Sequence, residues 1–212
     1  MGSPSVAASW KQLLLNSIQS NSHLNHSSYL QIATVASNGR PSNRTVVFRG
    51  FQDDGHKIQI NTDSRTRKID DLKHCPFAEI CWYFTNTWEQ FRIGGQVDVI
   101  DGTNSDPVKL QFPFNLYAKQ RERSWFACSL KSRMQYLAPA PRILFASEQQ
   151  PTETPTLDSS MSPVGVFCLL VLNPGQFLQV DYLNLKSNER LIFTAGQDGS
   201  GETHWSVEKV DP

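Results

Sequence analysis

Short β-rich runs recur along most of this chain, and in the run at residues 29–36 hydrophobic and polar positions alternate with the period of two typical of a half-buried β-strand. Turn residues such as Ser37-Asn38-Gly39 separate the runs. The runs predict strands at residues 29–36, 45–51, 57–61, 77–84, 89–100, 166–172, 177–185, 190–194 and 204–210. Gly94 and Gly95 fall inside one run, where they indicate a bulge or a close approach of two backbones.

Helical spacing of apolar residues is confined to three segments of the chain. These are residues 9–18, 65–74 and 107–137. Ser9 is suited to cap the first helix, residues 62–64 resemble a cap region for the second, and Pro113 is expected to break the third. Many short strands with few helices predict a mainly β fold, a barrel with peripheral helices.

The composition is that of an ordinary folded domain. The chain has 212 residues, of which 39% are hydrophobic and 19% charged. We therefore expect residues 1–212 to form a single domain. A polar, proline-rich segment at about residues 139–163, called the insert below, interrupts the alternating pattern and predicts a mobile surface loop.

The charge balance bears on the partners of this protein. Lys+Arg 20 and Asp+Glu 20 cancel, so no global field attracts nucleic acid or an anionic membrane. No apolar run approaches the roughly 20 residues that span a bilayer, and the N-terminus lacks the features of a secretory signal. We expect a cytoplasmic protein, or an organellar one if a transit segment has been removed. The scattered cysteines and histidines predict no metal site.

The densest local chemistry lies in residues 62–68, TDSRTRK, at the expected junction of a strand and a helix. Because the N-terminus of a helix is electrically positive, Arg65, Arg67 and Lys68 are unfavourable there unless an anion binds. Hydroxyl groups and arginine forks suit a phosphate group. The alternative is a solvated basic face paired with the acidic residues 70–71, and these residues alone favour neither interpretation.

Two strand motifs carry further candidate residues. Residues 44–50, RTVVFRG, have arginines near both ends, and alternation places Arg44 and Arg49 on opposite faces, so their side chains should not hold one ligand group. Residues 88–95, WEQFRIGG, contain Gln90, a donor and acceptor suited to the edge of a flavin ring. Taken singly, an ordinary strand with arginine ends and an exposed strand glutamine are the simpler interpretations.

The motifs RTVVFR, INTDSRTRK, WEQFRIGG and NERLIF…WSVEKVDP, in this order, resemble the pyridoxamine 5′-phosphate oxidase family, in particular its oxidase-related FMN-binding branch from cyanobacteria and plants. The resemblance covers nearly the whole chain apart from the insert. It implies a split β-barrel that binds FMN at a homodimer interface. It also implies oxidation of pyridoxamine or pyridoxine 5′-phosphate, small molecules of vitamin B6 metabolism, to pyridoxal 5′-phosphate with oxygen.

The resemblance also implies roles for individual residues. The implied cofactor-binding residues are Arg44, Thr45, Val46, Val47, Arg49, Asn61, Thr62, Thr66, Arg67, Lys68, Gln90, Lys131 and Ser132. The implied substrate-binding residues are Arg49, Tyr117, Arg121 and Arg190. Tyr117 and Arg121 are one helical turn apart, on one face. No catalytic acid or base is implied, because the flavin itself carries the chemistry.

The chain departs from the family pattern at three positions. Asn184-Leu185 stand in the region of an FMN-site tryptophan, Ile192 replaces a histidine beside the reacting centre, and Thr194 replaces an FMN-contacting arginine. Isoleucine cannot form a hydrogen bond, so we expect weak or narrow oxidase activity unless Asn184 or Asn188 supplies the missing donor. Two other functions stay open: an FMN-dependent reductase of another substrate, and a non-catalytic protein that binds flavin or a B6 phosphate.

Overall fold

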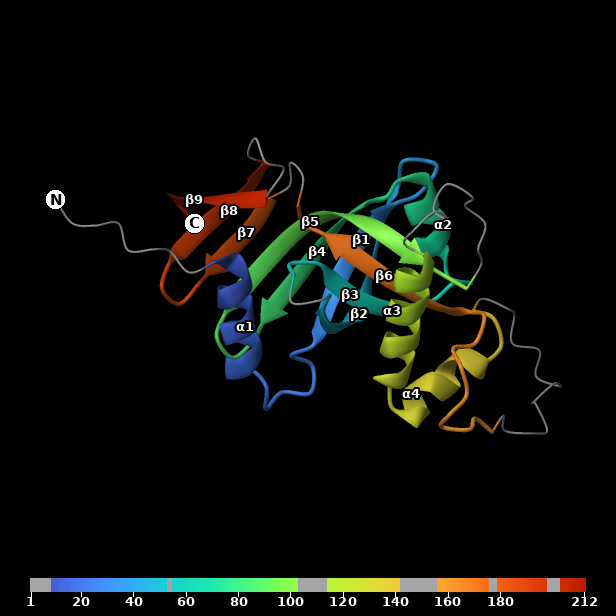
Figure 1. Ribbon diagram of the computed structural model, residues 1–212. Helices are drawn as coiled ribbons and strands as arrows, with labels where there is room; N and C mark the ends of the chain where they lie inside the picture. Colours follow the sequence, from blue (N-terminus) through green and yellow to red (C-terminus); the bar gives the residue numbers. More distant parts are fainter. Residues whose placement is uncertain (1–8, 53–54, 103–113, 142–155, 176–178, 198–202) are drawn as a thin grey trace.

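A closed barrel of six antiparallel strands forms the centre of the molecule (Figure 1). The computed structural model describes residues 9–52, 55–102, 114–141, 156–175, 179–197 and 203–212. The barrel strands are β1 (Tyr29–Val35), β2 (Pro41–Phe51), β3 (Ile58–Asp63), β4 (Phe77–Phe84), β5 (Glu89–Ile100) and β6 (Phe167–Asn173). They follow the order β1-β2-β3-β6-β5-β4, and β4 closes the ring by pairing with both β5 and β1.

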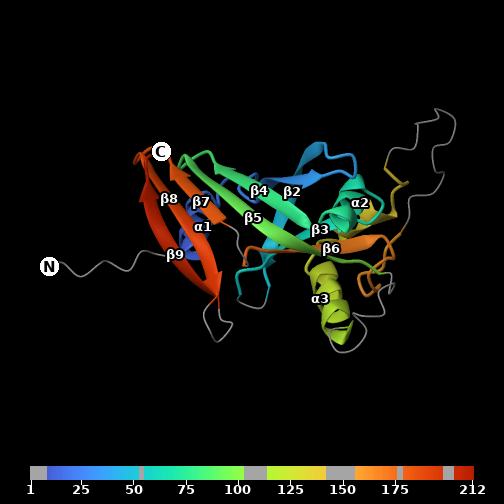
Figure 2. The same cartoon turned by 90° about the horizontal axis from the view of Figure 1, so that it is seen from above.

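Three further strands extend the sheet beyond the barrel. They are β7 (Gln179–Asn184), β8 (Glu189–Gln197) and β9 (Thr203–Val210). The first part of β5, residues 89–93, pairs with β7, whereas its last part, residues 96–100, pairs with β6. Since β5 belongs to both parts of the sheet, β7, β8 and β9 branch from the barrel at β5 and stand beside it, as Figure 2 shows. This arrangement confirms the predicted split β-barrel.

The helices lie outside the barrel. They are α1 (Trp10–Ser20), α2 (Arg67–His74), α3 (Phe114–Phe126) and α4 (Leu130–Met134), the last followed by a 3₁₀ turn at Gln135–Leu137. Ser9 caps α1 as expected, because its hydroxyl accepts a hydrogen bond from the backbone N–H of Gln12. Figure 1 shows α1 near β7, β8 and β9, with α3 and α4 at the opposite end. No helix in the described part of the chain is long and apolar enough to cross a membrane.

The core lies inside the barrel and consists of the inward-facing side chains at alternate positions of the strands. Fully buried examples are Leu30, Ile32, Ile58, Ile60, Ile80, Trp82, Phe91 and Ile93. By contrast, β6 is buried along both faces from Phe167 to Leu172, because α3 and the end of the insert cover its outer side. Gly95 confirms the expected close approach, since a Cβ there would come within 2.5 Å of Leu172.

Two helix boundaries differ from the sequence expectation. The helix α2 starts after Thr66 instead of after residues 62–64, because β3 continues its pairing with β6 as far as Asp63. The segment 107–137 is not one helix, because α3 ends at Phe126 and Ser129 caps a separate α4. The expected break at Pro113 lies outside the described residues.

The insert is only partly a surface loop. Residues 142–155 lie outside the described part of the chain, but the end of the insert packs firmly. Leu157 is buried with Trp125 and Phe167, and the indole N–H of Trp125 donates a 2.7 Å hydrogen bond to the carbonyl oxygen of Met161. The expectation of a wholly mobile loop is therefore wrong for this end, because Leu157 gives the polar segment an apolar anchor.

Candidate functional site

A half-buried lysine, Lys68, lies at the junction of β3 and α2. The ammonium group of Lys68 donates hydrogen bonds to the hydroxyls of Thr62 (2.8 Å) and Thr66 (2.9 Å), and it forms no ion pair with any described residue. Burial lowers the pKa of Lys68, and the nearby charge of Arg44 lowers it further. Because the side chain of Thr66 does not cap α2, the helix N-terminus adds a second positive feature at the same place.

The two arginines of this junction differ in their surroundings. The guanidinium of Arg65 forms a fork on the carboxylate of Asp63, with Nε–Oδ1 and Nη2–Oδ2 distances of 3.0 and 2.6 Å. Burial alone would raise the pKa of Asp63, but the hydrogen bonds and charge of Arg65 hold it below its usual value. Arg67 is exposed and makes no hydrogen bond or ion pair within the described residues. Arg67, and not Arg65, is therefore available to an anion.

Arg44 lies behind this junction, in a polar network between β1, β2 and α2. Its Nη1 donates to the hydroxyl of Thr34 (2.6 Å) and to the carbonyl oxygens of Ser42 (3.0 Å) and Ile32 (3.3 Å). Its Nη2 lies 3.3 Å from a carboxylate oxygen of Asp71, which also accepts a 2.7 Å hydrogen bond from Thr34. Arg44, Thr62, Thr66, Arg67 and Lys68, called the clamp below, suit a phosphate monoester.

Of the strand residues that the sequence analysis assigned to the flavin, only some face outward. Thr45 is exposed and Val47 half-buried on the outer face of β2, whereas Val46 is buried in the barrel core beside Leu30. The side chain of Val46 therefore points away from a cofactor on the outer face. Gln90 faces outward from β5 and pairs across the sheet with Tyr83 and Leu183. The outer face of β2, β1, β4 and β5 thus continues from Thr45 to Gln90.

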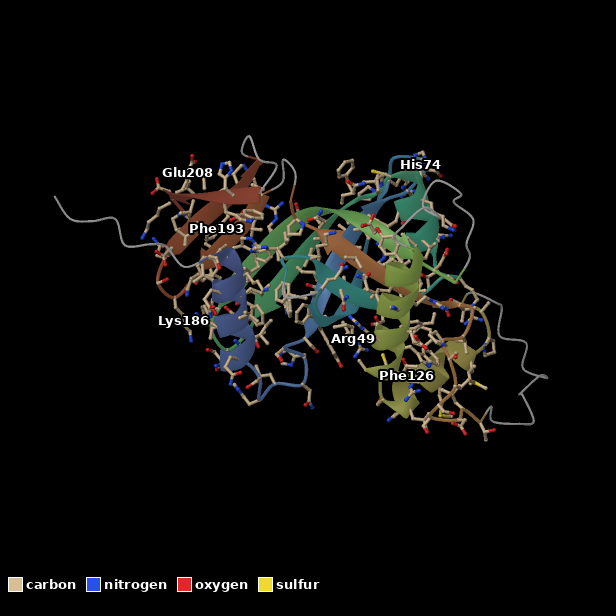
Figure 3. All side chains as sticks on the ribbon, viewed as in Figure 1. Arg49, His74, Phe126, Lys186, Phe193 and Glu208 are labelled. Atoms are coloured by element: carbon tan, nitrogen blue, oxygen red, sulfur yellow. The ribbon has the colours of Figure 1, made fainter. Side chains whose placement is uncertain are left out.

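A pocket of about 420 Å³ opens between β2, β3 and α3, and Arg49 lies in its wall (Figure 3). The other lining residues are Phe48, Phe51, Gln59, Asn61, Gln120, Arg123, Ser124, Ala127 and Cys128. Asn61 is fixed from both sides, because it accepts a 2.6 Å hydrogen bond from the hydroxyl of Ser124 and donates to the sulfur of Cys128 at 3.1 Å. The pocket combines aromatic walls with two guanidinium groups, those of Arg49 and Arg123.

The sequence analysis missed the α3 residues of this pocket. Gln120, Arg123 and Ser124, continued by Ala127, recur at intervals of three and four, so they share one helical face. That spacing was present in the sequence, but it did not indicate which face of the helix meets the barrel. Arg49 and Arg44 lie at different places, as expected from the alternation along β2. Arg49 lines the pocket, and Arg44 lies behind the β3–α2 junction.

Tyr117 and Arg121 share a face of α3, but that face does not line the pocket. Arg121 donates from Nε to the carbonyl oxygen of Phe167 (2.8 Å) and from Nη2 to that of Val164 (2.6 Å). Burial lowers the pKa of Arg121. Tyr117 packs against the small apolar cluster around Leu169. Arg123 thus lines the same pocket as Arg49, whereas Arg121 contacts the start of β6.

The remaining predicted residues lie apart from the pocket lining. Arg190 of β8 forms a fork on Asp181 of β7, with Nε–Oδ1 and Nη2–Oδ2 distances of 3.0 and 2.8 Å, and Arg92 of β5 lies 3.8 Å from the same carboxylate. Lys131 is exposed on α4, and Ser132 lies in the capped first turn of that helix.

The positions that depart from the family pattern lie on β7 and β8. Ile192 pairs with Asp181, on the face that carries Arg190. The side-chain amide of Asn184 is already engaged, because its N–H donates to the hydroxyl of Tyr182 at 3.3 Å and its oxygen accepts from the backbone N–H groups of Lys186 and Ser187. Asn188 adopts a left-handed conformation with φ of 52° in the same turn. The substitution by Ile192 is therefore not offset by Asn184.

The clamp and the pocket fit a phosphate-bearing flavin and a second anionic ligand. Comparison with known proteins leads to the same family. The family model for the pyridoxamine 5′-phosphate oxidase, FMN-binding domain, matches residues 7–101. Pyridoxine/pyridoxamine 5′-phosphate oxidase 2 of Arabidopsis thaliana is 56% identical over 205 residues, which cover 97% of this chain and 98% of that protein.

Solved structures agree with this result. A pyridoxamine 5′-phosphate oxidase-related, FMN-binding protein of Nostoc punctiforme superposes with a TM-score of 0.79 at 34% identity, covering 98% of this chain and 100% of that one. PhzG of Burkholderia lata shares the fold, with a TM-score of 0.65 at 17% identity. FMN as the cofactor is thus confirmed, and the chain belongs to the pyridoxamine 5′-phosphate oxidase family of FMN-binding oxidoreductases.

Proposed function

We propose that this protein oxidises pyridoxamine or pyridoxine 5′-phosphate to pyridoxal 5′-phosphate with FMN and oxygen. The observation that carries the proposal is the pair Arg49 and Arg123 in one pocket with aromatic walls. Guanidinium groups bind phosphate by paired, charge-assisted hydrogen bonds. A volume of about 420 Å³ lies in the range of small-ligand pockets. The name of the Arabidopsis relative supports the same class of substrate.

In this proposal the clamp holds the terminal phosphate of FMN. Lys68 and Arg67 supply the charge, the hydroxyls of Thr62 and Thr66 supply neutral hydrogen bonds, and the N-terminus of α2 adds its dipole. The outer face of the sheet, with Gln90, would hold the flavin ring. The bound cofactor would supply the hydride acceptor and the route for electrons to oxygen.

The chain's own contribution to the reaction is positioning. Arg49 and Arg123 anchor the substrate phosphate, which fixes the distance between the reacting carbon and the flavin. Phe48 and Phe51, in T-shaped contact with a centroid distance of 5.4 Å, form an apolar part of the pocket wall. Because the family resemblance implies a histidine beside the reacting centre where this chain has Ile192, which offers no hydrogen bond, the proposal includes a slow turnover.

A homodimer is part of the proposal. The outer face of β1 and β4 exposes large apolar side chains, among them Tyr29 (48% exposed), Phe77 (55%) and Tyr83 (40%). Strand pairing places Tyr29 beside Val47 and Tyr83 beside Gln90, so the apolar surface adjoins the residues assigned to the flavin. A second copy of the chain would cover this surface and enclose the ring, as the family resemblance implies.

Anaerobic mixing of the FMN-loaded protein with pyridoxamine 5′-phosphate tests the reaction class. We expect the flavin absorbance to bleach, and admission of oxygen to restore it with release of peroxide. Pyridoxamine without the phosphate is the matched control and should bleach the flavin far more slowly. A flavin that a nicotinamide nucleotide bleaches, but B6 phosphates do not, would overturn the proposal in favour of a reductase.

A further inference from the structure

The geometry points to Asp71 as a positioning residue for the cofactor phosphate, acting through Arg44. Arg44 is a clamp residue by the proposed function, on which this inference rests. Asp71 carries no such assignment. It lies in α2, one turn beyond Arg67 and Lys68, and its side chain is 7% exposed. A buried carboxylate this close to a phosphate site repels the ligand unless it serves another group.

That other group is the guanidinium of Arg44. Nη1 is held by the hydroxyl of Thr34 and by the carbonyl oxygens of Ser42 and Ile32, all on β1 or β2. Asp71 is the only described residue outside these two strands that bonds Arg44, with an Nη2–Oδ2 distance of 3.3 Å. Asp71 therefore ties the plane of the guanidinium to the helix that begins at the clamp.

Thr34 completes the link in both directions. Its hydroxyl donates to Asp71 (2.7 Å) and accepts from Arg44 (2.6 Å), so the three side chains form a closed triangle. Such a triangle leaves the guanidinium little freedom to rotate, because its bonds come from two different elements. An arginine fixed in this way loses less side-chain entropy when a phosphate binds.

Asp71 also balances the charge of the clamp. Arg44 lowers the pKa of Lys68, which shows that these two cations repel each other, whereas Asp71 acts in the opposite direction. The carboxylate of Asp71 thus lets Arg44 and Lys68 lie near each other before the phosphate binds. Asp70, the adjacent residue, is exposed on the same helix and bonds no described residue, so it offers a matched control.

The test compares the affinities of the apoprotein for FMN and for riboflavin, which lacks the phosphate, by quenching of flavin fluorescence. For Asp71→Asn and Thr34→Val we expect FMN to bind about tenfold more weakly, with riboflavin affinity unchanged within about twofold. Asp70→Asn should leave both affinities unchanged. If Asp71→Asn does not fold, Thr34→Val alone carries the test, because it lies on β1 and nearly preserves the side-chain shape.

A double-mutant cycle separates positioning from simple support of α2. In an Arg44→Gln background, Asp71→Asn should cause no further loss of FMN affinity. Additive losses, equal losses of FMN and riboflavin affinity, or equal effects of Asp70→Asn and Asp71→Asn would each overturn the inference. Absence of B6-phosphate oxidation would contradict the proposed function and leave this inference standing, because the readout is FMN binding alone.

Discussion

The guanidinium of Arg121 donates a 2.8 Å hydrogen bond to the carbonyl oxygen of Phe167 and lies over the ring of the same residue, 5.8 Å from its centroid. A second bond, of 2.6 Å, reaches the carbonyl oxygen of Val164. Arg121 therefore joins α3 to the start of β6. Arg121 has the spacing expected of a substrate-binding residue, but its contacts in the structure hold α3 against β6.

Arg121→Met should destabilise the protein without weakening substrate binding. Hydrogen bonds from a charged group contribute roughly 1.5–3 kcal/mol, and a loss of about 2 kcal/mol lowers the melting temperature of a chain this long by about 4–8 °C. We expect the KM for pyridoxamine 5′-phosphate to stay within about twofold of wild type. Arg123→Met, the comparison variant, should raise KM for pyridoxamine 5′-phosphate. The reverse pattern would assign the substrate phosphate to Arg121.

Arg67→Ala should weaken FMN binding far more than Arg65→Ala. Arg67 is exposed at the clamp and makes no hydrogen bond or ion pair within the described residues, whereas Arg65 is already occupied by Asp63. Loss of one charge-assisted bond corresponds to at least about tenfold in affinity. Titration of both apoproteins with FMN measures the difference. Equal losses of FMN affinity would show that the family's phosphate-binding arginine has been assigned to the wrong position of this chain.

FMN affinity should fall in mildly alkaline solution. Burial and Arg44 lower the pKa of Lys68 in the empty protein, and a bound phosphate raises it again. At pH values between the pKa of Lys68 in the empty protein and its pKa in the complex, FMN binding takes up a proton. The affinity for FMN therefore falls as pH rises, by at most about tenfold per pH unit. Titrations from about pH 7.5 upward keep the phosphate fully ionised, because its second pKa is about 6. Lys68→Arg should remove the dependence, since arginine stays charged; a slope unchanged in that variant would assign the proton to another group.

Tyr83→Asp should dissociate the proposed homodimer and release FMN. Tyr83 is 40% exposed on the outer face of β4 and lies beside Gln90. A buried, unpaired carboxylate in the interface costs several kcal/mol. Leu15→Asp is the control, because Leu15 is 39% exposed on α1 and belongs to no surface assigned here. Light scattering should give a dimer for wild type and for Leu15→Asp, and a monomer for Tyr83→Asp. A wild-type monomer that retains FMN would contradict the shared site.

The strands could be predicted from sequence because period-two burial is local, and only their ends moved, as where β2 begins at Pro41 to match β1. The grouping of Thr62, Thr66, Arg67 and Lys68 could be read from the sequence for a similar reason, since these four residues adjoin one strand end. The pocket wall could not, because the spacing of Tyr117 and Arg121 defines a face but not its direction. The roles of Asp71 and Asp181 depend on contacts between distant segments, with Thr34 and Arg190, that no local pattern encodes.

The preference of the FMN-loaded protein for a phosphorylated amine tests the central claim most directly. Peroxide release is measured at varied concentrations of pyridoxamine 5′-phosphate and of pyridoxamine, for wild type and for Arg49→Met. The account predicts slow turnover, with kcat/KM about 100-fold higher for the phosphorylated amine, and a preference about tenfold smaller in Arg49→Met. Equal kcat/KM for the two amines, or no peroxide from either with FMN bound, would contradict it.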